Sequence, residues 1–61
     1  MKTDKGYDVV VNGVNRWFAD LEISAIACAG FHKEDNPEDT VQIRNRADGT
    51  LRTVLGHARV E

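Results

Sequence analysis

The sequence has little of several features that define common protein classes. Its 61 residues include one cysteine, one proline and four aromatic residues. The lone Cys28 has no intramolecular disulfide partner, which favours a reducing compartment and a cytoplasmic location. No run approaches the roughly 20 apolar residues of a membrane helix. No apolar segment follows the basic residues at the amino terminus either, so we expect neither a membrane anchor nor a signal peptide.

The composition is that of a globular chain, with 41% hydrophobic and 30% charged residues. Because the chain is short, we expect residues 1–61 to form a single small domain in which residues 1–6 are flexible. The charge is uneven. Residues 1–39 carry eight acidic and four basic side chains, whereas residues 40–61 carry four arginines and two acidic side chains. Arginine suits planar recognition of carboxylate or phosphate, although a solvated strand face is the simpler interpretation.

The clearest local signal is Asn12-Gly13 between two β-rich runs, which predicts a hairpin with a type I′ turn. A two-residue turn places Val9 opposite Arg16, and it places Val10 and Trp17 together on the outer face of the hairpin. The predicted core face consists of Tyr7, Val9, Val11, Val14 and Phe18.

Residues 20–30 predict a short helix of two or three turns. Either Asp20 or Ser24 can cap its amino end, and Gly30 fits the position just after the last turn. Apolar residues recur at i, i+3 and i+4, which is typical of a core-facing side. Those residues are Ile23, Ile26 and Ala27.

The rest of the chain predicts a polar loop at 32–39, strands at 40–45 and 50–55, and a short fifth strand at 57–60. The element order indicates an α+β fold, a small ββαββ(β) sheet with one short helix packed on one face. In the strand at 40–45 the inward residues are Val41 and Ile43. In the strand at 50–55 one side has Leu51, Thr53 and Leu55, and the other, outer side has Arg52 and Val54.

The residues that could carry catalysis are few. Cys28 stands among alanines, where a buried, inert thiol is the ordinary outcome, and the histidines His32 and His57 complete no recognisable constellation. An acidic cluster follows His32, but its spacing does not match a calcium loop. We therefore expect no enzyme, metal or cofactor. The carboxylates of that cluster belong to Glu34, Asp35, Glu38 and Asp39.

Short elements along the chain are similar to those of bacterial multiubiquitin-type domains, which have the ubiquitin-like β-grasp fold. They are Val11-Asn12-Gly13, Trp17, Ile23-Ser24, Ala29-Gly30-Phe31, Thr40-Val41, Gly49, and Gly56 with Val60. The resemblance implies a non-enzymatic module that binds other proteins, such as a microbial or phage mimic or inhibitor of a host system. It also implies a further strand in the middle of the sheet and a Gly-Gly terminus, which this sequence lacks. Without that strand, we expect unpaired edges on the first and third strands, satisfied by the last residues, by a second copy in a dimer, or by a different ββαββ arrangement.

The outer sheet face is the predicted binding site for a partner protein, because an apolar centre with an arginine rim suits an interface. The predicted site residues are Val10, Trp17, Arg44, Arg52 and Val54. Two alternatives remain open. The acidic loop (Glu34, Asp35, Glu38 and Asp39) could imitate phosphate and inhibit a nucleic-acid-handling complex, or the arginine-bearing strands could bind RNA.

Overall fold

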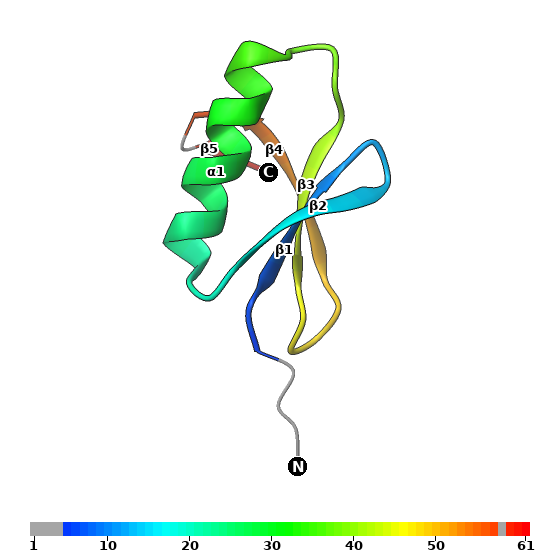
Figure 1. Ribbon diagram of the computed structural model, residues 1–61, viewed down its shortest axis with the longest axis vertical. Coiled ribbons are helices and arrows are strands. Elements are labelled where there is room, and N and C mark those ends of the chain that lie inside the picture. The colour runs from blue at the N-terminus through cyan, green and yellow to red at the C-terminus, as the bar shows by residue number, and fades with distance from the viewer. Residues whose placement is uncertain (1–4, 58) are drawn as a thin grey trace.

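The computed structural model describes residues 5–57 and 59–61 and has one helix packed on one face of a five-stranded sheet (Figure 1). Neighbouring strands are antiparallel throughout, in the order β2-β1-β3-β4-β5. The predicted α+β fold is thus confirmed, together with the fifth strand, although Ala58 of the predicted 57–60 segment and residues 1–4 of the predicted flexible segment lie outside the described residues. The elements are β1 (Tyr7–Val11), β2 (Val14–Ala19), α1 (Glu22–Asp35), β3 (Val41–Asn45), β4 (Leu51–Gly56) and β5 (Arg59–Val60).

The β1–β2 turn has the geometry that its sequence predicts. Asn12 and Gly13 have φ angles of 52° and 83°, and Val11 pairs with Val14. Positive φ at both central residues is the requirement of a type I′ turn, which Asn and Gly meet at little cost. The hairpin prediction is confirmed at its turn.

Further from the turn, a β-bulge changes the predicted register. Val10 pairs with Asn15, but Val9 pairs with Trp17, so Arg16 is an extra residue in β2. The predicted pairing of Val9 with Arg16 is therefore wrong. Since side chains alternate along a strand, one inserted residue moves everything after it to the other face. Trp17 lies on the helix side with Val9, and Phe18 lies on the open face of the sheet.

The helix is longer than its sequence signals suggest. It continues through Gly30, which is buried, and its N-cap residue Leu21 makes no side-chain capping bond, so neither predicted cap is used. A glycine inside a helix costs about 1 kcal/mol, and hydrogen bonds at the carboxyl end help to offset it. Both the backbone N–H and the side-chain amide of Asn36 donate to the carbonyl of His32. Residues 32–35 of the predicted loop are thus the last turn of α1.

The first and third strands pair directly with each other. Val11 pairs with Val41, and Val9 pairs with Ile43. No strand lies between them in the described part of the chain, so the unpaired edges expected on β1 and β3 do not arise. Of the three explanations considered, a different ββαββ arrangement is the one that the structure has. The edges of the sheet are β2 and β5.

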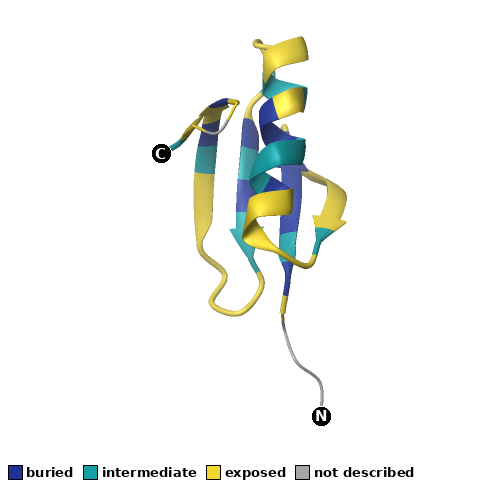
Figure 2. Ribbon diagram, turned by 90° about the vertical axis from the view of Figure 1, so that its left-hand side faces the viewer, coloured by how far each residue is buried: buried dark blue, intermediate teal, exposed yellow. Residues whose placement is uncertain are grey.

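The core lies between α1 and the centre of the sheet, as the burial colours of Figure 2 make visible. Small residues dominate it, because the helix meets the sheet through alanines and the strands contribute mainly valine. The inward positions of Val41 and Ile43 are as predicted. The buried cluster consists of Val9, Val11, Ala25, Ala29, Val41, Ile43 and Val54.

The face assignment in β4 differs from the prediction. Arg52 pairs with Ile43 and Leu51 pairs with Arg44, which puts Arg52 and Val54 on the helix side of the sheet. Val54 is fully buried, while Leu51 and Leu55 are about half exposed. Pairing with β3 therefore fixes the register of β4, and the more hydrophobic side of the β4 sequence is left toward solvent.

Candidate interaction surfaces

The five residues predicted to form one outer surface are divided between the two faces of the sheet. Val10 and Arg44 lie on the open face, and Val10 is only 3% exposed. Trp17, Arg52 and Val54 lie on the helix side, where Val54 has no exposed surface. The predicted apolar centre with an arginine rim is therefore wrong as a single surface, because both strand registers differ from those inferred.

Trp17 lies between β2 and the last turn of α1. Its ring centroid is 5.4 Å from that of His32, and the guanidinium carbon of Arg16 is 5.2 Å from the centroid of its indole. The indole nevertheless remains 40% exposed. Trp17 is thus neither a core residue nor part of the open face, but a partly covered side chain at the rim on the helix side.

The strand arginines predicted to bind RNA, Arg44 and Arg52, lie on opposite faces of the sheet. Arg52 extends toward α1, where it lies 3.3 Å from a carboxylate oxygen of Glu22. Arg46 donates to the buried carboxylate of Asp8 at 3.2 Å, and its guanidinium lies 4.8 Å from the ring centre of Phe18. These cations have carboxylate or aromatic partners within the fold, which lowers their availability for phosphate.

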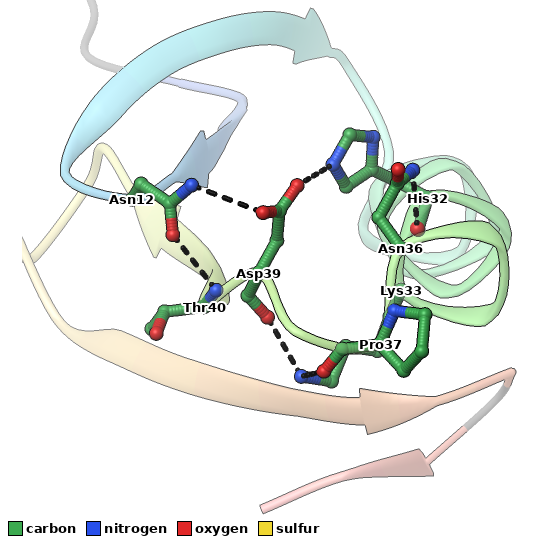
Figure 3. A network of polar contacts seen from close by, with 7 residues as sticks. All are labelled: Asn12, His32, Lys33, Asn36, Pro37, Asp39 and Thr40. Atoms are coloured by element: carbon green, nitrogen blue, oxygen red, sulfur yellow. Dashed lines mark hydrogen bonds and ion pairs between the residues drawn. The ribbon is translucent and has the colours of Figure 1, made fainter.

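Asp39 is the centre of a polar network that joins three segments (Figure 3). One of its carboxylate oxygens lies 2.9 Å from Nε2 of His32, and the other accepts from the Asn12 side chain at 3.2 Å. The hydrogen bond from His32, and then that from Asn12, lowers the pKa of Asp39. Asn12 also accepts from the backbone N–H of Thr40. The network therefore fastens the β1–β2 turn and the helix end to the start of β3.

Two more contacts strengthen the region of the predicted acidic loop. Lys33 donates to the backbone carbonyls of Pro37 and Asp39 at 2.8 and 2.7 Å. Glu34 accepts from the backbone N–H of His57 at 3.1 Å. Of the four carboxylates predicted to imitate phosphate, Glu34 and Asp39 thus have structural partners. Asp39 is half-buried, and Glu34 is exposed like Asp35 and Glu38. The four do not form one free acidic surface.

The residues considered for catalysis, Cys28, His32 and His57, each contact other parts of the fold. Cys28 is partly buried and packs against the core, and the ring of His57 lies 5.2 Å from that of Phe31. The residues that the structure describes form no pocket and no group of three metal-binding side chains. Within the same residues, no helix has the length and apolar content needed to cross a membrane.

A ridge of apolar side chains that the sequence pattern did not predict runs along the outer side of α1. We call it the helix stripe, and it consists of the exposed Ile23 and Phe31 with the half-buried Ala27 between them. Ile23 is 74% exposed and Phe31 is 63% exposed. The predicted core-facing side is therefore wrong for Ile23 and Ala27. Ala25 and Ala29 supply the buried contacts, and Ile26 packs against them as predicted. The pair of small residues four positions apart was the signal that could have located the core side, since alanine lets a helix approach a sheet closely.

Comparisons of the chain with protein-family models, curated proteins and solved structures found no match.

Proposed function

We propose that the protein is a non-enzymatic module that binds another protein through the helix stripe. The observation that carries the proposal is the exposure of Ile23 and Phe31 on a helix whose core side is built from alanine. The core of this small domain consists mainly of valine and alanine, whereas the larger side chains of Ile23 and Phe31 are exposed to water. Burying each against a partner would be worth about 1.5–3 kcal/mol.

The geometry of the stripe fits a protein partner. Residues at i, i+4 and i+8 form one continuous ridge along a helix, and such ridges pack into apolar grooves. Acidic side chains stand at the carboxyl end of the same helix, where Glu34 and Asp35 are exposed. We infer a partner with an apolar groove and a basic rim, because complementary charge at the rim speeds encounter and fixes orientation.

The resemblance to ubiquitin-like domains supports the same class of function. Such modules act by presenting a surface to other proteins, and a mimic or inhibitor of a host system would need only that surface. The proposal does not depend on a Gly-Gly terminus, because a binding surface acts without conjugation.

The test is affinity capture from the source cells, with the full chain immobilised and bound proteins identified by mass spectrometry. We expect Ile23→Asp to reduce capture of the specific partner about tenfold or more, since a charge would be buried in the interface. Leu51→Asp is the matched control, because Leu51 is also exposed and apolar but lies on the open face of the sheet. Circular dichroism establishes that each variant is folded.

Three results would count against the proposal. The first is a partner that binds folded Ile23→Asp as well as the wild-type chain. The second is a partner lost with Leu51→Asp alone, which would assign binding to the open face. Absence of any captured protein above the level of a blank support would also contradict a binding role in those cells.

A further inference from the structure

The strand β2 is an exposed edge of the sheet along nearly its whole length. Five of its six residues are exposed, among them Val14 at 58% and Phe18 at 50% (Figure 2). The opposite edge, β5, has only two residues. Proteins usually protect edge strands by making them short, by placing charged residues or proline on them, or by a bulge. β5 is short, whereas β2 has only the bulge at Arg16 and the charge of that residue, and its other five residues carry no charge.

The backbone of β1 shows which groups of the hairpin are already paired. Asn12 N–H donates to the carbonyl of Thr40, and the carbonyl of Gly6 accepts from Arg46 N–H. Both bonds point toward β3. Because alternate residues of a strand bond to opposite neighbours, the even-numbered residues of β1 bond to β3 and its odd-numbered residues bond to β2.

This alternation identifies the free backbone groups of β2. Asn15 and Phe18 stand opposite the even-numbered residues Val10 and Asp8, which bond to β3. Their own N–H and C=O groups therefore point away from the sheet. A strand laid against β2 would meet them as a preformed template of donors and acceptors.

The side chains beside this edge would cover an added strand from both sides. Trp17 and Phe18 are consecutive, so their rings lie on opposite faces of the sheet. The one charge within β2, on Arg16, has its guanidinium over the Trp17 ring, 5.2 Å from the centroid. The edge thus has outward backbone groups with an aromatic ring on each face of the sheet. Its one cation, Arg16, lies against the ring of Trp17.

We propose that the occupant of this edge is a second copy of the chain, whose own β2 pairs antiparallel with it about a two-fold axis. The spacing of the outward groups favours this occupant. Asn15 and Phe18 are three residues apart because of the bulge at Arg16, whereas a regular strand presents outward groups at every second residue. Antiparallel pairing about a two-fold axis sets Asn15 of each copy opposite Phe18 of the other, so the two edges match in spacing.

The size of the core favours self-pairing as well. The largest fully buried side chains are Val9, Val41 and Val54. A domain of this size gains much from additional apolar burial, and pairing would bury parts of Trp17 and Phe18 in each copy. The pairing goes beyond the proposed function, since it uses β2 and leaves the helix stripe free for another protein.

Sedimentation of the full chain across a wide concentration series tests the pairing. We expect the mass to rise from that of one chain to that of two, and no further, because β5 is too short to propagate the sheet. Asn15→Pro removes an outward N–H without removing a bond to β1, so it should weaken dimerisation about tenfold or more. Asn15→Ala keeps that N–H and should dimerise within about twofold of the wild type.

Amide hydrogen exchange of the wild-type chain gives a second test that needs no variant to fold. The N–H groups of Asn15 and Phe18 should be protected at high protein concentration and should exchange rapidly at low concentration. A monomer at every concentration overturns the proposal. So does a dimer in which these amides stay unprotected, or one that persists in folded Asn15→Pro. The Ile23→Asp variant should still form the dimer, and this result would separate pairing through β2 from binding at the helix stripe.

Discussion

Nε2 of His32 lies 2.9 Å from a carboxylate oxygen of Asp39, and this contact joins the last turn of α1 to the segment that leads into β3. The same carboxylate holds the side chain of Asn12. Ionised Asp39 is thus the acceptor at a junction of three segments, which explains why its pKa lies below the ordinary value of 3.8.

A lowered pKa at Asp39 makes the stability of the protein depend on acid. A carboxyl whose pKa is lower in the folded chain than in the unfolded chain stabilises the fold above its unfolded pKa. That contribution is lost as the pH falls through the folded pKa. We expect the urea midpoint of the wild type to decrease below about pH 4, and Asp39→Asn to show a smaller decrease.

A matched variant separates this effect from general acid sensitivity. Asp48 also has a lowered pKa, caused by hydrogen bonds from the backbone and side chain of Thr50 in the β3–β4 turn. Asp48→Asn should remove its own share and leave that of Asp39. Identical acid slopes for the wild type and both single variants would show that neither contact contributes.

Glycine is required at position 6 for two reasons, its positive φ and its contact with the ring of Phe18. Its φ is 105°, and a Cβ at this position would overlap the ring of Phe18. We expect Gly6→Ala to lower the free energy of unfolding by about 1–3 kcal/mol in urea titrations. In a Phe18→Ala background the substitution should cost less, because the steric part disappears and the backbone part remains. An equal cost in both backgrounds would contradict the contact with the ring.

The buried and exposed sides of β4 can be told apart by truncation. Val54→Ala should destabilise the protein by about 2–3 kcal/mol, because it removes fully buried methyl groups and leaves a cavity. Leu55→Ala removes a larger side chain, yet it should cost less than about 1 kcal/mol because Leu55 is half exposed. The reverse order of costs in urea unfolding would restore the face assignment that the sequence pattern suggests.

Local signals predicted the parts of the fold that local chemistry determines. Asn12-Gly13 identified the turn, and the alternation of Val41 and Ile43 identified their inward side. The length of α1 was harder to predict, because Gly30 is a typical helix terminator and the bonds that extend the helix come from Asn36, beyond it. The presence of Gly30 alone therefore does not reveal the hydrogen bonds from Asn36 that stabilise the helix beyond it.

The predicted binding surface was wrong because it depended on which side chains of β2 and β4 point to which face of the sheet. The bulge at Arg16 moved Trp17 to the helix side, and no residue type announces a bulge of this kind. In β4 the alternating pattern is equally regular on both sides, so only pairing with β3 decides whether Val54 or Leu55 is buried. One residue of shift in either strand reverses which side chains a partner can meet.

The double pairing of β1 has a consequence for how the chain folds. One neighbour, β2, follows after a two-residue turn, whereas the other, β3, arrives only after α1 and the following loop. The hairpins β1–β2 and β3–β4 are local and can form early, while pairing of Val11 with Val41 must close the whole segment between them. Fourteen residues of that segment are helical, which shortens the chain to be closed. We therefore expect the pairing of β1 with β3, rather than formation of α1 or of either hairpin, to set the folding rate.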